Sequence, residues 1–262
     1  MKLAISNIGW KEEHDRYVYG RMKECGFSGL EIAPTRILQS NPYDRIVEID
    51  AWNAAISAEY GFRIPSMQSI WFGRSEKVFG TDDERQFLLD YTQKAILFAE
   101  KIGCKNMVFG CPRNRTILDD ADDRVAVEFF KKIGDFAYEH HTAIGMEANP
   151  PIYNTNYIND TRAALELIRR VESKGFLLNL DVGTMVYNEE CVDLLVGDEH
   201  LINHVHISEP YLAPIQKRHL HKELAQLLRN ANYHGYVSIE MGKREDVSII
   251  ESTMDYVACT FG

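Results

Sequence analysis

Four polar residues stand at or near the ends of short apolar segments in the second half of the chain. Glu147 closes Ala-Ile-Gly-Met-Glu, Asp181 closes Phe-Leu-Leu-Asn-Leu-Asp, and Glu240 closes Tyr-Val-Ser-Ile-Glu. His206 lies within His-Val-His-Ile-Ser. Taken singly, each carboxylate could cap a following helix, and a lone histidine is more often a hydrogen-bonded core residue.

Taken together, the four residues indicate a metal site. Three carboxylates that lie within a few ångströms of one another repel, and such a cluster is tolerated mainly when a cation neutralises it. Three oxygens and one imidazole nitrogen suit Mn²⁺, Mg²⁺, Co²⁺ or Zn²⁺ and do not distinguish among these ions. We therefore predict that Glu147, Asp181, His206 and Glu240 bind a divalent metal ion.

The segments that carry these residues belong to a repeating pattern. Runs rich in β-branched and aliphatic residues alternate with longer stretches of helical period, which favours parallel β/α units. The runs predicted to be strands are residues 3–7, 29–34, 63–70, 106–111, 143–149, 176–182, 204–208 and 236–241. Eight such units predict an α/β fold, a (β/α)8 TIM barrel that forms one domain over residues 1–262.

The clearest predicted helix covers residues 82–102. Its expected buried face repeats at helical spacing through Phe87, Tyr91, Ala95, Phe98 and Ile102. Thr81 and Glu84 have the spacing of a capping box at its start. Asn159 or Asp160 is expected to cap the following helical segment through residue 170.

In such a barrel the carboxyl ends of the strands converge on one face, where substrates bind. Gln68 and Trp71 follow the third predicted strand, and Trp71 could stack on a sugar ring or be buried by packing. Arg113 and its neighbour Arg115 follow the fourth strand, where a guanidinium could bind an anionic substrate group or stay solvated. Lys217 follows the seventh and could serve a phosphate or merely lead into the next helix.

Deeper positions of the same strands carry further polar residues. His204 lies two residues before His206, hence on the same side of the strand and one layer lower. We expect it to support the metal ligand by hydrogen bonding or to contact the substrate, with a role as a second ligand as the alternative. Asn179 and Ser238 hold the equivalent positions below Asp181 and Glu240, where we expect them to support the ligands, and Glu31 lies on the second strand.

Composition excludes several classes of function. The net charge of −10 disfavours nucleic acid, and no apolar run is long enough to span a membrane. Five scattered cysteines without a C-x-x-C pair fit reduced thiols, and nothing resembles a signal peptide, so we expect a cytoplasmic protein. The oligomeric state stays open, with a homo-oligomer as one alternative.

At these residues the sequence resembles the sugar isomerase and epimerase superfamily of xylose-isomerase-like TIM barrels. Its members include keto-hexose 3-epimerases, hydroxypyruvate isomerase, inosose dehydratase and, more distantly, endonuclease IV. The superfamily's metal set, in the order Glu, Asp, His, Glu on strands five to eight, matches Glu147, Asp181, His206 and Glu240. Ser-Met-Gln-Ser at the third strand and Gly-Tyr-Val-Ser-Ile-Glu-Met at the eighth are also similar.

The resemblance implies a divalent-metal-dependent isomerase or epimerase of a small sugar or sugar phosphate. Glu147 and Glu240 would act as acid and base, moving a proton next to a carbonyl through a metal-bound enediolate. Three departures disfavour the usual keto-hexose 3-epimerase contacts. Thr184, Tyr153 and Leu212 stand where those epimerases carry a histidine, a glutamate and an arginine.

Two alternatives remain. A metal-dependent dehydratase of a polyol or inosose begins with the same proton loss and needs an acid for the leaving group, for which His221 or Tyr153 is available. The second alternative is a barrel that binds a sugar or a partner protein without catalysis. A nuclease is disfavoured by the acidic surface and by the lack of histidines at the earlier strand ends.

Overall fold

The computed structural model describes residues 1–118 and 122–262. In this part of the chain, parallel strands form one eight-stranded sheet in the order β2-β1-β8-β7-β6-β5-β4-β3. The strands are β1 (Lys2–Ser6), β2 (Gly29–Glu31), β3 (Ser66–Met67), β4 (Asn106–Phe109), β5 (Ile144–Met146), β6 (Phe176–Asp181), β7 (Ile202–Ile207) and β8 (Tyr236–Ile239).

Backbone contacts between the two outer strands nearly close the sheet into a barrel. Isolated bridges join Gly29 to Arg63 and Ile32 to Met67. The amide of Ile32 donates to Ser66 O at 3.2 Å, and the amide of Gln68 donates to Ile32 O at 2.9 Å. The predicted (β/α)8 barrel is therefore confirmed.

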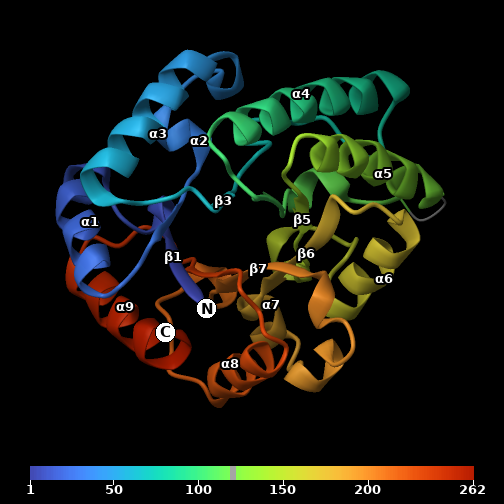
Figure 1. Ribbon diagram of the computed structural model, residues 1–262. Coiled ribbons are helices and arrows are strands. Elements are labelled where there is room, and N and C mark those ends of the chain that lie inside the picture. The colour runs from blue at the N-terminus through green and yellow to red at the C-terminus, as the bar shows by residue number, and fades with distance from the viewer. Residues whose placement is uncertain (119–121) are drawn as a thin grey trace.

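Helices surround the strands on the outside of the barrel, and the view in Figure 1 looks along its axis. The described α-helices are α1 (Asp15–Glu24), α2 (Pro34–Ile37), α3 (Ile46–Tyr60), α4 (Asp82–Lys101), α5 (Arg124–Glu139), α6 (Thr161–Val171), α7 (Val182–Tyr187), α8 (His219–Asn230) and α9 (Val247–Phe261). Each strand is followed by at least one of them, so every strand end opens toward the same face of the barrel.

The helix starts follow their predicted caps. The amide of Glu84 donates to Thr81 Oγ1 and the Glu84 carboxylate accepts from the Thr81 amide, which completes the capping box of α4. Asp160 caps α6 by accepting from the Ala163 amide at 2.8 Å. The predicted buried face of α4 was wrong at Phe87, which is 41% exposed and stacks on Tyr91 at the edge of the helix.

The third strand is shorter than predicted. Residues 63–70 were expected to be extended throughout, yet only Ser66–Met67 is a strand. Pro65 has no amide hydrogen to donate to the neighbouring strand, and Ser69 has a positive φ of 56°, which turns the chain out of the sheet. This turn begins the segment that forms part of the barrel's open end.

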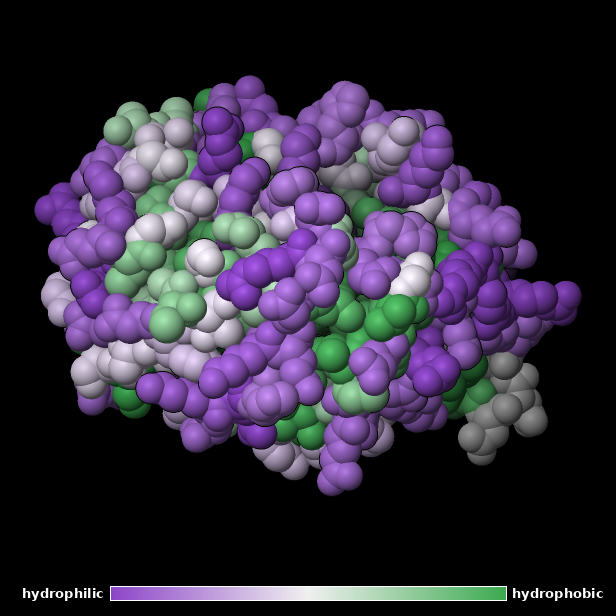
Figure 2. All heavy atoms as spheres, turned by 60° about the horizontal axis from the view of Figure 1, so that its bottom comes forward, coloured by the Kyte–Doolittle hydropathy of each residue, from purple (hydrophilic) through white to green (hydrophobic). Residues whose placement is uncertain are grey.

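The face of the molecule shown in Figure 2 is mostly hydrophilic, with groups of hydrophobic residues between the hydrophilic ones. Within the described ranges, no helix combines the length and the apolar character needed to cross a membrane.

Candidate metal centre

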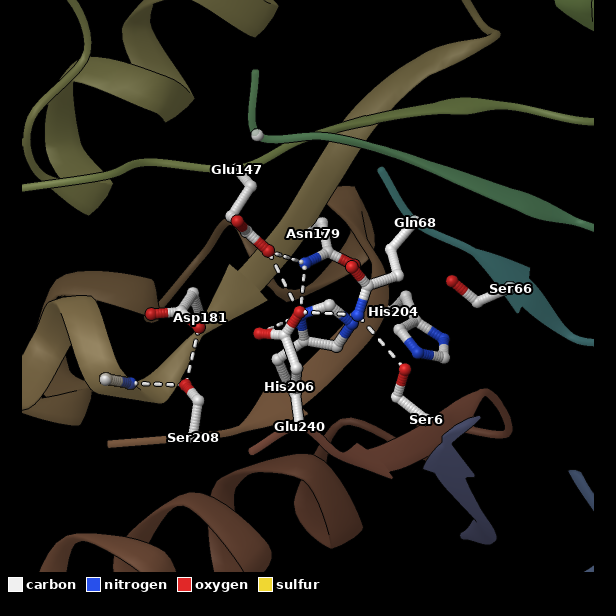
Figure 3. Close-up of polar contacts among 12 residues, drawn as sticks. Ser6, Ser66, Gln68, Glu147, Asn179, Asp181, His204, His206, Ser208 and Glu240 are labelled. Atoms are coloured by element: carbon white, nitrogen blue, oxygen red, sulfur yellow. Dashed lines mark hydrogen bonds and ion pairs between the residues drawn. The ribbon is translucent and has the colours of Figure 1, made fainter. Parts of the chain in front are cut away.

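The ends of the last four strands bring the predicted ligands together. Asp181 on β6 and His206 on β7 are register partners, so they lie side by side. Glu147 follows β5 and Glu240 follows β8. One ligand atom from each of these four residues lies within 4.8 Å of the others, and Figure 3 shows Glu147, His206 and Glu240 pointing toward one another.

The spacing of the donor atoms fits a divalent cation. Nδ1 of His206 lies 3.0 Å from Glu147 Oε2 and 3.2 Å from Glu240 Oε2. An octahedral ion with ligands at about 2.1 Å requires adjacent donors about 3 Å apart. Three carboxylates and one imidazole also form a donor set that suits Mn²⁺, Mg²⁺, Co²⁺ or Zn²⁺. These residues can therefore hold such an ion.

Amide side chains fix the two glutamates in place. Asn149 Nδ2 donates to Glu147 Oε1 at 3.0 Å, and Asn179 Nδ2 donates to Glu147 Oε2 at 2.8 Å. Gln68 Nε2 donates to Glu240 Oε1 at 2.9 Å. Both carboxylates thus keep their orientation without an ion, which lowers the cost of binding one.

Asp181 is positioned by the start of α7. Its Oδ1 accepts from the Thr184 amide at 2.6 Å, and its Oδ2 accepts from the Ser208 hydroxyl. Burial, together with the charges of Glu147 and Glu240, raises the pKa of Asp181 to about 7. A metal ion beside this buried carboxyl group would supply positive charge and so favour its ionised form.

His206 is held from behind by a buried acid. Its Nε2 lies 2.9 Å from Oε2 of Glu31, and His204 Nε2 lies 3.1 Å from the same oxygen. Burial opposes the charge on Glu31, but the two histidines outweigh it and lower the pKa of this carboxyl. For His206, burial favours the neutral ring, yet Glu240, Glu31 and Glu147 raise its pKa well above the usual value. The Glu31 contact leaves Nδ1 as the nitrogen that faces the carboxylate cluster.

A polar layer inside the barrel lies below the cluster. Asn106 Nδ2 donates to Asn179 Oδ1 at 3.1 Å and to Ser66 Oγ at 3.0 Å. Gly145 on β5 makes room for this layer, because a Cβ there would lie 2.4 Å from Asn106 Oδ1. Asn179 thus supports Glu147 as predicted for its deeper position, whereas the buried Ser238 hydroxyl has no hydrogen-bond partner among the described residues.

A cavity of about 180 Å³ opens onto the carboxylates. Its lining residues are Gln68, Ser69, Val108, Gly110, Cys111, Pro112, Glu147, Asn149, Tyr153, Asp181, Glu209, Leu212 and Glu240. Four of them are acidic, and among the described residues that line it none is Lys or Arg. The cavity is large enough for a small polyhydroxylated molecule and its walls carry negative charge.

The predicted substrate contacts are only partly assembled around this cavity. Gln68 lines it. Trp71 does not: its ring packs against Phe109, and its indole nitrogen donates to Thr92 Oγ1 at 2.8 Å. Arg113 and Lys217 are exposed and lie outside the lining, and His204 is buried beneath it at Glu31.

The second arginine of the loop after β4 is a structural residue. Arg115 is fully buried, and its guanidinium donates to the carbonyls of Phe109, Glu147, Tyr157 and Ile158 and of Gly110. It also donates to Asn149 Oδ1 at 3.0 Å. Its donors are therefore engaged in holding the loops around Glu147, and it does not face the cavity.

The three positions that depart from the epimerase pattern lie in different surroundings. Tyr153 and Leu212 line the cavity. The Thr184 hydroxyl is buried and donates to Ala148 O at 2.8 Å. Tyr153 Oη accepts from the Tyr211 amide at 2.8 Å, so this tyrosine ties the loop after β5 to the loop after β7.

Sequence reasoning missed several contributors to the site. Asn149, two residues after Glu147, and Ser208, two after His206, follow the alternation of their strands, and this spacing could have found them. Glu209 lines the cavity and is fixed by Arg218. Glu31 was noted as a polar strand end, but its contact with His206 crosses the barrel and leaves no local signal.

Comparison with known proteins agrees with this architecture. Among curated proteins, none matches the chain. Among solved structures, the chain is similar to 3-keto-D-glucoside 4-epimerase YcjR from E. coli, with 22% identity, a TM-score of 0.76, and coverage of 99% of this chain and 98% of that one. It is also similar to D-psicose 3-epimerase from Clostridium cellulolyticum H10, with 15% identity, a TM-score of 0.78, and coverage of 100% and 98%.

A third similar structure is that of a protein named as a dehydratase. The probable 3-DHS dehydratase AsbF from Bacillus anthracis is 16% identical, with a TM-score of 0.70 and full coverage of both chains. At these identities the solved structures show a shared fold. A family model described as xylose isomerase-like TIM barrel matches residues 20–257. The chain therefore belongs to the xylose isomerase-like TIM barrel family.

Proposed function

We propose that the protein is a divalent-metal-dependent isomerase or epimerase of a small sugar. One observation carries the proposal: Glu147 and Glu240, at the ends of β5 and β8, converge on the buried imidazole of His206. Both glutamates line the cavity together with the fourth ligand, Asp181. The similar structures named as sugar epimerases support the choice of reaction and of substrate class.

The chemistry follows from the arrangement of the carboxylates. A divalent ion held by Glu147, Asp181, His206 and Glu240 would polarise a substrate carbonyl and so acidify the C–H beside it. Glu240 is placed to act as the base, because burial raises its pKa and the Gln68 amide holds its carboxylate at the cavity. Removal of the C–H proton by Glu240 places the electron pair on the carbonyl oxygen as an enediolate.

Glu147 then completes the reaction from the other strand. Its carboxylate accepts hydrogen bonds from Asn149 and Asn179, which hold it in a fixed orientation toward the cavity. In Figure 3 the two glutamates reach His206 from different sides. Glu147 gives its own proton to the same carbon from the second side, which inverts that centre and leaves Glu147 ionised and Glu240 protonated until both exchange protons with water. A proton given to the neighbouring carbon interconverts an aldose and a ketose.

Two measurements test this function. Purified protein is expected to retain a divalent metal by elemental analysis, and a panel of ketoses, aldoses, their phosphates and inososes is expected to show metal-dependent exchange of a C–H proton with deuterated water. Glu240→Gln should abolish exchange, by about 10³-fold or more, and leave the fold intact. Absence of exchange with every compound would remove the catalytic proposal and favour a barrel that only binds.

A dehydratase is the second candidate, and Tyr153 is the observation that favours it. Of the two acids considered from the sequence, His221 is buried against Tyr256 and lies outside the cavity lining. Tyr153 lines the cavity, and burial raises its pKa to about 12, so it is a neutral phenol with a proton to donate. A dehydratase would release water from inososes or polyols after the same exchange step.

A further inference from the structure

A second hollow lies beside the first at the open end of the barrel. It has a volume of about 470 Å³, and Trp10, Thr35, Arg36, Gln39, Phe72 and Lys243 are among its lining residues. These residues follow β1, β2, β3 and β8, so the hollow occupies the half of the barrel mouth that the carboxylate cavity leaves free. Ser69 lines both spaces, so the carboxylate cavity and the second hollow adjoin at this residue.

The wall between the two spaces is tied to the catalytic glutamate. Ser69 Oγ donates to Gln68 Oε1 at 2.8 Å, and Gln68 Nε2 donates to Glu240 Oε1 at 2.9 Å. Ser69 has a positive φ of 56°, and this turn leads to Phe72, whose ring is 66% exposed at the edge of the second hollow. A molecule whose reacting part meets Glu240 can therefore extend past Ser69 toward an aromatic ring.

The charges of both spaces disfavour a phosphate. The first cavity carries Glu147, Asp181, Glu209 and Glu240, without Lys or Arg among its described lining residues, and a phosphate there would be repelled. In the second hollow, Arg36 is paired with Asp15, with Nη1 to Oδ2 at 3.2 Å.

The remaining charges of the second hollow offset each other. Lys243 is exposed and Glu12 lines the same space. The uncharged groups that remain, Thr35, Gln39 and the ring of Phe72, suit a hydroxylated ring that has both polar edges and an apolar face.

We propose that the substrate is an uncharged glycoside in which two rings are joined by a glycosidic bond. This rests on the proposed function: the ring with the carbonyl occupies the carboxylate cavity, and the second ring extends past Ser69 to lie against Phe72 in the second hollow. The second ring supplies binding energy at a distance from the reacting carbon, which holds that carbon beside Glu240.

The test compares substrates that differ only in the second ring or in a phosphate. Metal-dependent deuterium exchange is measured for uncharged keto-monosaccharides, their phosphate esters, and keto-glycosides with a second sugar ring. The two-ring compounds are expected to exceed the one-ring compounds in kcat/KM by about tenfold or more, and the phosphates to fall below both. Phe72→Ala should reduce the two-ring preference by about threefold to tenfold.

A matched variant removes an exposed aromatic side chain elsewhere. Tyr138 is 53% exposed near the C-terminal end of α5, at the opposite end of the barrel from the strand ends, so Tyr138→Ala should leave the substrate preference unchanged. Equal kcat/KM for one-ring and two-ring compounds, or a preference that Phe72→Ala leaves intact, would overturn the inference. Processing of phosphates in preference to neutral sugars would overturn it too.

Binding separates this inference from the proposed function. Calorimetry with Mn²⁺-loaded protein compares methyl glucoside with methyl maltoside and methyl cellobioside, which have no free carbonyl and therefore cannot undergo the exchange. Tighter binding of a two-ring sugar that Phe72→Ala weakens, in a protein that exchanges no proton with any compound, would uphold the second hollow as a sugar site and reject the isomerase. Failure of every two-ring sugar to bind more tightly than methyl glucoside would reject the second hollow.

Discussion

Glu31 and His206 are joined across the interior of the barrel, with Oε2 of Glu31 2.9 Å from Nε2 of His206 and both side chains fully buried. β2 and β7 are not neighbours in the sheet, so this contact links opposite parts of the barrel wall. It directs the second ring nitrogen, Nδ1, at Glu147 and Glu240. The orientation of the only imidazole among the predicted ligands thus depends on a residue from the other half of the chain.

Glu31→Gln is expected to weaken metal binding by about tenfold to a hundredfold. The amide keeps the size of the side chain but removes the negative charge that orients His206 and makes it a better donor. Competition of the purified protein against a chromogenic chelator gives the affinity. Glu166→Gln, at an exposed position on α6, is the matched control and should bind metal as the original protein does. Equal affinity for all three proteins would show that Glu31 does not support the ligand.

Metal binding is expected to release protons, and its stabilising effect should grow with pH. Burial and the neighbouring carboxylates raise the pKa of Asp181 to about 7, and the three facing glutamates raise the pKa of His206 despite its burial. Both groups therefore hold protons in the folded metal-free protein at a pH where the unfolded chain has lost them. Their contribution to stability is present at low pH and is lost as pH rises toward and through the folded pKa values.

A metal ion reverses this loss, because it binds the deprotonated ligands. The difference in Tm between Mn²⁺-loaded and chelator-treated protein should therefore increase from pH 5 to pH 8. Calorimetry in buffers of different ionisation enthalpy should show proton release on binding at pH 7. A difference in Tm that is constant over this range would mean that Asp181 and His206 are not the groups that bind the ion.

The fold could be predicted from the sequence because the alternation of apolar strands with helices and the polar residues at the strand ends both indicate a parallel β/α barrel. Glu147, Asp181, His206 and Glu240 each stand at or near the end of an apolar strand. A closed parallel barrel brings the carboxyl ends of its strands to one face, so their proximity can be predicted without knowing any side-chain contact. Local rules also sufficed for the Thr81 capping box. Strands, helices and helix caps that depend on a repeating local pattern of residues can be predicted in this way.

Contacts that depend on packing could not be predicted. Whether Trp71 faces a substrate or the core is decided by Phe109 and Thr92, which reach it from other elements. Arg113 and Arg115 are two arginines separated by one residue, yet Arg113 is exposed and Arg115 is fully buried. Both lie in one short 3-10 helix (Pro112–Arg115), in which residues two positions apart point to different sides, and packing decides which side is buried.

The two arginines allow a direct comparison of buried and exposed positions. Arg115→Met should destabilise the protein by about 3–5 kcal/mol, because it removes the donor that satisfies several buried carbonyls around Glu147. Arg113→Met should change the free energy of unfolding by less than about 0.5 kcal/mol. Urea denaturation measures both. A small effect of Arg115→Met would mean that water replaces the guanidinium in the loop.

Tyr153→Phe distinguishes the two candidate reactions. The phenol is neutral at working pH because burial, followed by the charge of Asp181, raises its pKa to about 12. In an isomerase or epimerase the proton moves between the substrate and the glutamates, so the variant should retain C–H exchange and turnover within about tenfold. In a dehydratase that uses Tyr153 as acid, exchange should persist while elimination falls by about a hundredfold or more. Tyr211→Phe is the control, since its backbone amide, the group that contacts Tyr153, is unchanged. Loss of exchange itself in Tyr153→Phe, with Tyr211→Phe normal, would contradict both mechanisms and place Tyr153 at the proton-transfer step.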